Sequence, residues 1–299
     1  MLFPISGIEV NPFIPFIVAF AVSFFTSMGG VSGAFLLLPF QVSYLGYATP
    51  SVSATNQVFN IVAIPSGVYR YIREGRMLWP LTWAVIIGTL PGVFIGAWIR
   101  IKYLPDAKNF KLFVGVVLFY IGFRLFMDVI KNKGQKKVSN ATQTAGERHI
   151  VRLLESTFRV VKFDYDGETH QFSPLTVYVI CFLVGIIGGV YGIGGGSIVA
   201  PFFVAIIGLP VYTVAGAALM GTFITSVAGV IFYQYLSLVY TDMAVAPDWI
   251  LGALFGLGGL FGMYLGARTQ KFVPARVIKT ILCVCVLFVA VRYIAVFFG

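Results

Sequence analysis

The chain has 299 residues, of which 59% are hydrophobic and only 11% are charged. A soluble protein of this size needs far less apolar surface, so the composition excludes that class and predicts a chain that lipid solvates. The formal net charge of +10 does not indicate a nucleic-acid partner, because the basic residues lie in loops between apolar runs, where lipid headgroups and membrane topology explain them.

Eight apolar segments are predicted as membrane segments. In chain order they cover about Phe13–Leu45, Val52–Tyr69, Leu78–Ile99, Phe110–Met127, Pro174–Ile207, Val211–Tyr235, Trp249–Ala267 and Ile278–Phe298. About twenty helical residues cross the hydrocarbon of a bilayer. The first and fifth segments have more than thirty residues. Each therefore predicts either a re-entrant pair of half-helices or one strongly broken helix.

One stretch of the chain is written twice. The stretch MGGVSGAFLLLPF at Met28–Phe40 recurs within YGIGGGSIVAPFF at Tyr191–Phe203, where Gly30, Gly33 and Pro39 match Gly192, Gly195 and Pro201. The match continues for about thirty residues at the same offset of 162 positions. Each copy places glycines and a proline inside an apolar run. This pattern is typical of transporters built from two related bundles, each with a helix broken near mid-membrane.

Glycines spaced by four residues recur in the third and seventh segments. They are Gly88, Gly92 and Gly96 in the third and Gly258, Gly262 and Gly266 in the seventh. Small residues at this spacing let two helices approach closely, so we predict static helix packing at both places. A sliding contact during transport is the alternative.

A polar stretch, 131–173, separates the two halves and holds eight of the 21 Lys and Arg residues. Lys131–Asn140 is typical of a loose basic linker, and Glu147–Phe158 of a short amphipathic helix. The letters VVKFDYDGETHQF then predict a β-hairpin that turns at Asp166–Gly167. We expect a cytosolic connector without chemistry; a regulatory or partner-binding role is the alternative. Residues 1–130 and 174–299 are then the two membrane repeats.

The loops suggest how the chain is oriented. The loop with Arg70, Arg73 and Arg76 and the polar middle stretch are separated by one helix pair, so both are expected on the cytoplasmic side, together with the loop Arg268–Lys279. This assignment makes the halves inverted copies and places the two glycine breaks on either side of a pseudo-twofold axis near the bilayer centre. Parallel copies remain the alternative, because the outward loop Arg100–Lys111 also carries four basic residues.

The glycine breaks predict an anion site. Glycines let the chain turn and expose N–H groups, and a half-helix that starts there points its positive dipole end at the break. Such groups bind anions; close helix packing alone is the alternative. Nucleotide binding is excluded, because the glycine cluster lacks the lysine of a phosphate loop. The expected site positions at the breaks are Gly30, Ser32, Gly33, Gly192, Gly194, Gly195, Gly196 and Ser197, with Pro39 and Pro201 as helix breakers.

Polar side chains interrupt the second and sixth segments. Those expected at the site are Asn56, Gln57, Asn60, Thr222 and Ser226. Asn56 and Asn60 are four residues apart and share a helix face, as do Thr222 and Ser226. Amides and hydroxyls in hydrocarbon are costly unless they are paired or face a wet cavity. Neutral donors converging on a substrate are one reading, and interhelical hydrogen bonds are the other.

Acidic and metal-binding residues are scarce in the predicted spans. No Asp or Glu lies mid-span, and the two histidines, His149 and His170, both fall in the polar middle stretch. We therefore expect no metal, no cofactor and no enzymatic activity. Donors without acidic partners favour an anionic substrate. Each negative charge that leaves a cytoplasm held negative gains about 2.3 kcal/mol per 100 mV, so anion export needs no coupled proton.

At these residues the chain resembles the sulfite exporter TauE/SafE family of membrane permeases. YGIGGGSIVAPFF with the following AGAALMGTFITSVAGVIFY is similar to the second-repeat signature of that family, and SMGGVSGAFLLLPF with SATNQVFNIVAIPSG resembles the first. The likeness covers nearly all of the chain outside 131–173. Carried over, Gly192, Gly194, Gly195, Gly196 and Pro201 match the second motif, and Gly30, Gly33 and Pro39 match the first. Ser32 and Ala34 stand where the second copy has Gly194 and Gly196, so the half-sites are expected to contribute unequally.

The resemblance implies transport of sulfur-containing anions such as sulfite, sulfoacetate and other organosulfonates. We therefore predict an all-α polytopic protein of the cytoplasmic membrane, with two inverted repeats of about four apolar segments each. The expected function is export of such an anion, with the lipid bilayer and the anion as partners and a homo-oligomer allowed. The alternatives are an uptake permease for sulfonate or sulfate-like anions and a non-transporting membrane helper subunit.

Overall fold

The structure is a computed structural model that describes residues 1–28, 32–75, 77–131, 152–157, 159–165, 167–203, 207–209, 211–269, 272–273 and 275–298. Its first half contains strands β1 (Leu2–Phe3) and β2 (Ile8–Glu9) and helices α1 (Phe13–Met28), α2 (Ala34–Ser43), α3 (Ser51–Ala63), α4 (Pro65–Arg73), α5 (Trp79–Lys102) and α6 (Ala107–Lys131). Strands β3 (Arg152–Ser156), β4 (Val161–Tyr165) and β5 (Glu168–Phe172) follow. The second half contains α7 (Pro174–Tyr191), α8 (Gly196–Phe202), α9 (Val211–Val239), α10 (Trp249–Thr269) and α11 (Ala275–Phe298).

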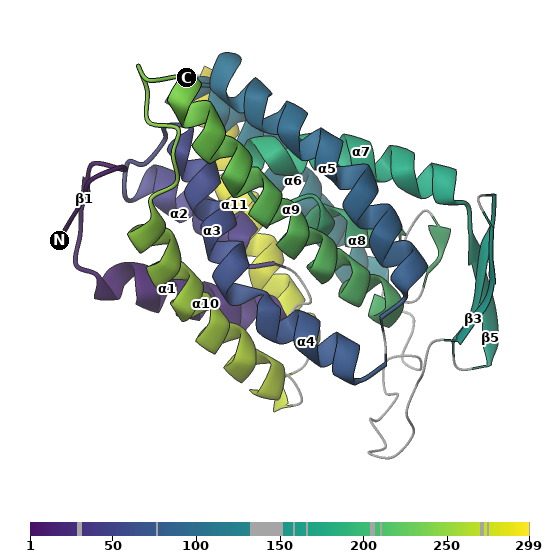
Figure 1. The fold of residues 1–299 in the computed structure, drawn as a ribbon. Coiled ribbons are helices and arrows are strands. Elements are labelled where there is room, and N and C mark those ends of the chain that lie inside the picture. The colour runs from purple at the N-terminus through teal and green to yellow at the C-terminus, as the bar shows by residue number, and fades with distance from the viewer. Residues whose placement is uncertain are drawn as a thin grey trace.

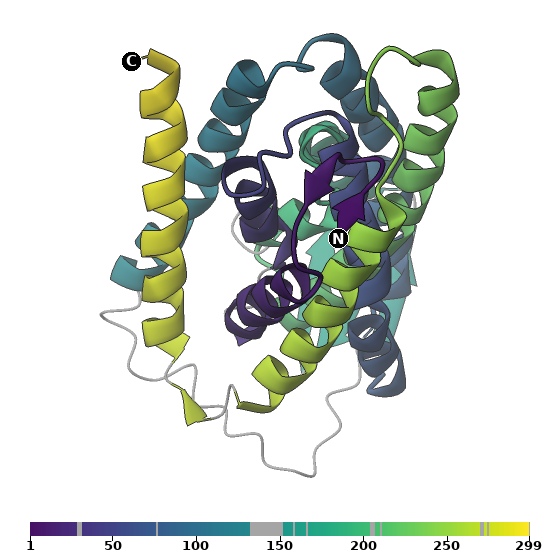
Figure 2. The ribbon, with the colours of Figure 1, turned by 90° about the vertical axis from the view of Figure 1, so that its left-hand side faces the viewer.

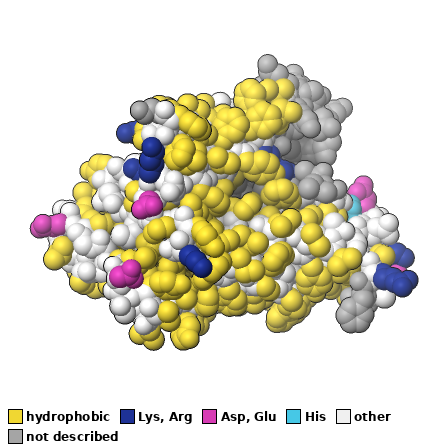
Figure 3. Space-filling model, turned by 90° about the horizontal axis from the view of Figure 1, so that it is seen from above, with side chains coloured by type: hydrophobic (Ala, Val, Ile, Leu, Met, Phe, Trp, Pro, Cys, Tyr) yellow, Lys and Arg dark blue, Asp and Glu magenta, His cyan; other side chains and the backbone are white. Residues whose placement is uncertain are grey.

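Most of these helices form one bundle (Figure 1). In the described chain, six helical stretches are long and apolar enough to cross a membrane: Trp79–Lys102, Ala107–Met127, Pro174–Tyr191, Thr213–Val239, Trp249–Gly266 and Thr280–Phe298. Figure 2 shows α1 and α2 between α11 on one side and α10 on the other. The face drawn in Figure 3 is mostly apolar, with few charged side chains scattered over it. The chain is therefore a multi-pass membrane protein, as its composition predicts.

The second apolar segment is not one helix. Helix α3 ends at Ala63, and α4 begins at Pro65 in a new direction. Proline lacks an N–H group and its ring clashes with the carbonyl four residues back, so it does not continue a straight helix but is well accommodated in a first turn. The position that corresponds to Pro65 at the 162-residue offset is Val227, and α9 runs through it unbroken.

The glycine stripes lie at tight helix contacts, as their spacing predicts. Helix α5 packs along α7, and a Cβ added to Gly88 would lie 2.7 Å from the Cβ of Cys181. At Gly92 and Gly96 an added Cβ would overlap backbone atoms of α7. The second stripe makes the same kind of contact between α10 and α1: Gly258 and Gly262 lie directly against carbonyl groups of α1. These contacts leave no room for a side chain.

The contacts also give the direction in which neighbouring helices run. Positions along α5 and α7 increase together, so these two helices are parallel, and the same holds for α1 and α10. Helices α3 and α9 cross in opposite directions, because Gln57 lies against Gly229 while Asn60 bonds to Ser226. Helices α6 and α11 are also antiparallel, because Gly115 lies against Tyr293 whereas Gly122, further along α6, lies against Leu287.

A three-stranded antiparallel sheet of order β3-β4-β5 follows α6. The predicted hairpin is confirmed: Val161 pairs with Phe172 and Gly167 has φ +79° at the turn, although Asp166 itself is outside the described residues. The predicted helix over Glu147–Phe158 is wrong at 152–156, which form β3 because pairing with β4 overrides a weak local preference. The expected linker lies outside the described residues apart from its first position.

A short hairpin of β1 and β2 that the sequence did not predict closes the opposite end of the bundle (Figure 1). The backbone N–H and the hydroxyl of Ser6 donate to Oδ2 of Asp248 at 3.1 and 2.9 Å. The other carboxylate oxygen accepts the N–H of Leu251 at 3.1 Å and so caps the start of α10. We call this the hairpin end of the bundle, and the end that carries β3–β5 the sheet end.

Candidate functional site

Both long segments are interrupted where the glycines stand. Helix α1 ends at Met28 and α2 begins at Ala34, whereas α7 ends at Tyr191 and α8 begins at Gly196. Gly30 lies outside the described residues. In the second interruption Gly192 and Gly194 have φ +78° and +71°, a left-handed conformation that glycine adopts without strain. The N–H of Gly192 bonds back to the carbonyl of Gly188 at 2.9 Å, which terminates α7.

The two prolines do not mark the interruptions. Pro39 lies inside α2 and Pro201 inside α8, so the chain breaks at the glycines upstream of both. Because Pro39 has no N–H group, the carbonyl of Phe35 loses its usual partner four residues on. The hydroxyl of Tyr191 donates to that carbonyl at 2.7 Å, and Tyr191 is fully buried. The last residue of α7 is thereby tied to the helix that follows the first interruption.

Five residues meet where α3 crosses α9, and we call them the crossing cluster: Gln57, Asn60, Thr222, Ser226 and Gly229. The Nδ2 group of Asn60 donates to Oγ of Ser226 at 3.3 Å. A Cβ added to Gly229 would lie 2.7 Å from Nε2 of Gln57, so this amide lies directly against the backbone of α9. The four side chains of the cluster are buried, and none is more than 1% exposed.

The second interruption lies against the crossing cluster. A Cβ added to Gly194 would be 3.1 Å from Oγ of Ser226, and one added to Gly196 would be 2.6 Å from Oγ1 of Thr222. Two predicted site glycines lie elsewhere. Gly195 is against the side chain of Thr89 on α5, and Gly192 is against the backbone of α3 at Ser53. The side chain of Ser197 is outside the described part of the structure.

The first interruption is held by Asn56. Its Nδ2 group donates to the carbonyl of Ala34 at 3.2 Å, and its Oδ1 accepts from Nε2 of Gln41 at 3.3 Å. Oγ of Ser32 accepts the N–H of Ala34, the first residue of α2, at 3.3 Å. Asn56 therefore anchors α2 to α3 and does not join the crossing cluster through a hydrogen bond.

Two polar residues near the first interruption were not among the sequence predictions. Ser23 on α1 lies against Gly33, whose added Cβ would be 2.9 Å from Oγ of Ser23. Gln41 lies on α2 and contacts Asn56. Gln41 could have been found, because it is an amide within an otherwise apolar run. Ser23 had no such signal, since single serines are common in membrane helices.

Several buried polar atoms of this region have no hydrogen-bond partner among the residues that the structure describes. They are Oε1 and Nε2 of Gln57, Oδ1 of Asn60, Oε1 of Gln41 and Oγ of Ser23. A buried polar group without a partner costs about 1–3 kcal/mol, so these atoms require something polar to bind them. The arrangement therefore offers unsatisfied amide groups in the interior of the bundle.

No charged side chain takes part in the crossing cluster. In the described chain, the fully buried charged residues are Arg100 and Asp248, and both are engaged elsewhere. Arg100 donates to the carbonyls of Leu104 and Ala48, and its guanidinium lies 3.7 Å from the centre of the Phe110 ring. The described residues also contain no group of three or more possible metal ligands. The crossing cluster is thus electrically neutral.

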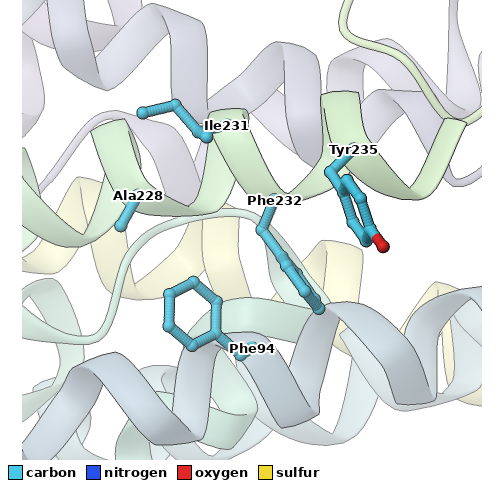
Figure 4. A pocket seen from close by; sticks show the side chains of 5 residues that line it. All are labelled: Phe94, Ala228, Ile231, Phe232 and Tyr235. Carbon is cyan, nitrogen blue, oxygen red and sulfur yellow. The ribbon is translucent and has the colours of Figure 1, made fainter. Parts of the chain in front are cut away.

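A pocket of about 400 Å³ lies between α5 and α9 and contains none of the predicted site residues (Figure 4). Its lining is apolar apart from one hydroxyl and consists of Phe94, Ala228, Ile231, Phe232 and Tyr235. The rings of Phe94 and Phe232 lie 4.9 Å apart and join the two helices. Because Ile231 and Tyr235 are 65% and 60% exposed, this pocket opens toward the lipid-facing surface and offers little to an anion.

Comparison with known proteins gives one family. The family model described as "Sulfite exporter TauE/SafE" matches residues 15–293. A probable membrane transporter protein, YunE of Bacillus subtilis, is 22% identical over 278 residues, which cover 90% of this chain and 92% of that protein. A probable membrane transporter protein of Xylella fastidiosa is 23% identical over 280 residues, with 91% and 92% coverage.

A plant relative is more similar over a shorter stretch. Sulfite exporter TauE/SafE family protein 6 of Arabidopsis thaliana is 41% identical over 105 residues, which cover 35% of this chain and 23% of that protein. No solved structure matches the chain.

Proposed function

The chain belongs to the sulfite exporter TauE/SafE family of membrane transporters, and from this premise we propose that it exports a small sulfur-containing anion across the cytoplasmic membrane. The proposed substrates are sulfite, sulfoacetate and other organosulfonates. One observation carries the proposal: buried amides without partners lie at the crossing of α3 and α9, directly beside the second helix interruption. Unsatisfied polar groups at mid-bundle indicate a solute path, because a purely structural contact would pair them.

We further propose that the two halves are inverted repeats. The directions of the helices support this: the matched helices α3 and α9 cross antiparallel, and so do α6 and α11. The contacts between the halves support it too. Helix α5 of the first half packs on α7 of the second, and the corresponding helix α10 of the second half packs on α1 of the first. Asn60 and Thr222, which match at the 162-residue offset, both belong to the crossing cluster. A twofold axis would therefore pass through the cluster, where alternating-access transporters bind their substrates.

The anion would be held by neutral donors. Nε2 of Gln57 is unpaired and lies in the crossing cluster, beside the second interruption. Gly194 and Gly196, which lie against Thr222 and Ser226, would let the backbone of the second interruption approach the solute. Asn56 and Ser32 would act indirectly by fixing α2, given their observed contacts.

The sheet end of the bundle would face the cytoplasm. Arg70 and Arg73 at the end of α4 and Arg268 near the end of α10 lie toward this end, and the acidic residue Asp248 lies at the other. Excess basic residues mark cytoplasmic loops. In this orientation an anion that leaves the cell moves down the membrane potential and gains about 2.3 kcal/mol per charge per 100 mV.

The test is flux of sulfite and a panel of organosulfonates in proteoliposomes that contain only this protein, with an imposed potential of either sign. Export of at least one of these anions that is driven by a negative interior supports the proposal. Flux that is coupled to an ion gradient and directed inward would support uptake instead. Absence of flux for every anion tested would indicate a helper subunit.

Variants link the flux to the site. Asn60→Ala removes one amide of the crossing cluster and should lower flux at least tenfold without loss of membrane insertion. Thr82→Val is the matched control, because the hydroxyl of Thr82 is also fully buried but bonds to the carbonyl of Leu78, the residue just before α5. Equal flux in the two variants would remove Asn60 from the site.

A further inference from the structure

We infer that the transported species is a monoanion that carries its own hydrogen-bond donor, such as a hydroxyl group, and that Gln57 and Asn60 select for that donor. The inference rests on the proposed function, and it narrows the substrate class from sulfur-containing anions in general. It follows from which atoms of the crossing cluster are unpaired and from the absence of charge there.

Gln57 has both halves of its amide unpaired. The side chain is fully buried, and neither Oε1 nor Nε2 has a partner among the described residues. The neighbouring residue across the interface is Gly229, which has no side chain to supply one. The NH₂ group needs an acceptor and the carbonyl oxygen needs a donor. A single bound group satisfies both only if it presents an acceptor next to a donor. A sulfonate oxygen serves Nε2 but leaves Oε1 unsatisfied.

Asn60 adds a second acceptor to the same place. It lies three residues after Gln57, on the same face of α3. Its Nδ2 group is already used by Ser226, whereas Oδ1 is buried and unpaired. The carbonyl oxygens of Gln57 and Asn60 are therefore both buried without a donor. An anion with oxygen acceptors alone would leave both oxygens unsatisfied and close to its negative charge, so this pair disfavours any substrate without an N–H or O–H group.

The neutral cluster also limits the charge of the substrate. In the described chain the buried charged residues Arg100 and Asp248 bond to other groups, so the crossing cluster contains no cation that compensates an anion. The cost of moving an ion out of water rises with the square of its charge, which makes a dianion about four times as costly as a monoanion. Bisulfite and hydroxysulfonates meet both conditions, whereas sulfate and the sulfite dianion do not.

Two sulfonates of the same charge and carbon number separate the possibilities. In proteoliposomes containing the wild-type protein, 2-hydroxyethanesulfonate should move at least tenfold faster than ethanesulfonate at equal subsaturating concentration, because a site built to bind a hydroxyl discriminates strongly against the analogue that lacks it. Sulfate should not move. Equal rates for the two sulfonates overturn the inference but leave the transporter proposal intact, whereas no flux of any anion overturns the transporter proposal.

Replacement of Gln57 then tests its role. Gln57→Met and Gln57→Leu keep the approximate size of the side chain and remove its hydrogen-bonding groups. Both should bring the ratio of the two sulfonate fluxes close to one, by loss of the hydroxysulfonate flux. A ratio that stays at the wild-type value in a variant that still moves ethanesulfonate rules out Gln57 as the selecting residue.

Sulfite provides a further test, because its charge and its hydrogen-bond donor depend only on its own protonation state. If sulfite is the only substrate that moves, its flux should rise as the pH falls in step with the bisulfite fraction, measured at constant total sulfite and constant potential. Flux that follows the dianion fraction overturns the inference.

Discussion

The hydrogen bond from Tyr191 to the carbonyl of Phe35 should couple energetically to Pro39. Its hydroxyl lies 2.7 Å from that carbonyl, and both residues are buried. In wild type the carbonyl depends on Tyr191, because Pro39 offers no N–H group. Tyr191→Phe leaves a buried acceptor unsatisfied and should destabilise the protein by about 1–2 kcal/mol, between the values typical of membrane interhelical bonds and of buried orphans in soluble proteins.

The Pro39→Ala background should remove most of this cost. An alanine at position 39 restores the N–H group that bonds to the carbonyl of Phe35 within α2. In that background Tyr191→Phe should cost about 0.5 kcal/mol or less, which gives a coupling free energy of about 1 kcal/mol in the double-mutant cycle. The free energies of unfolding are measured by titrating the purified protein from mild micelles into SDS, with tryptophan fluorescence as the signal.

A second tyrosine provides the control for this cycle. The hydroxyl of Tyr233 donates to the carbonyl of Gly189 at 3.2 Å, and Tyr233 is also fully buried. No proline has freed that carbonyl, so Tyr233→Phe should cost the same in both backgrounds. If Tyr191→Phe also costs the same with proline and with alanine at position 39, the explanation of how α2 accommodates its proline is refuted.

Three further predictions concern packing, capping and charge. Gly96→Ala should destabilise the protein by about 1–3 kcal/mol in the same unfolding assay, because its Cβ would overlap the backbone of α7, whereas Gly67→Ala should be tolerated, since the nearest atom is 3.4 Å away. Asp248→Ala should cost about 1 kcal/mol through the lost cap of α10 and should speed hydrogen exchange in the N-terminal hairpin; unchanged exchange would show that the carboxylate does not hold it. Lys162 bonds to Glu155 at 2.9 Å and lowers the pKa of the Glu155 carboxyl, so this pair should stabilise the sheet at pH values above the ordinary carboxyl pKa and lose that effect as the pH falls. Lys162→Met should raise the pKa of Glu155 measured by NMR. An unchanged pKa would contradict the pairing.

Composition and spacing predicted those features that depend on local sequence. Six of the eight predicted apolar segments overlap the six helical stretches that are long and apolar enough to cross a membrane, because length and hydropathy decide whether a helix crosses lipid. The tight contacts at Gly92 and Gly262 were predictable because small residues at intervals of four have few other uses. The hairpin at Gly167 followed from alternation and turn residues, which act over a few positions.

The errors arose where contacts between distant residues decide the structure. The break between α3 and α4 was missed although Pro65 was visible, because hydropathy continues across it. The sequence predicts Pro39 as a helix breaker, but α2 continues through it. The hydroxyl of Tyr191, 152 positions later in the chain, bonds to the carbonyl that the proline leaves without a partner. Strand β3 forms only because β4 is beside it. Of the predicted site positions, Asn60, Thr222 and Ser226 lie together where α3 crosses α9, and their binding of a solute stays a prediction. Asn56 instead contacts Ala34, which its position in the sequence did not reveal.

The neutrality of the crossing cluster bears on how a potential-driven exporter would work. An arginine in such a site would bind an anion firmly, and a strongly held solute leaves slowly, so flux requires binding that is favourable but weak. In this chain the buried Arg100 is engaged by the carbonyls of Ala48 and Leu104, away from Gln57 and Asn60. The site would then supply hydrogen-bonding specificity, while the membrane potential supplies the driving force. On this reasoning the selectivity for a substrate depends on whether its donors and acceptors match those of the site. The two unpaired carbonyl oxygens, of Gln57 and Asn60, therefore decide the selectivity more than the total number of donors in the site.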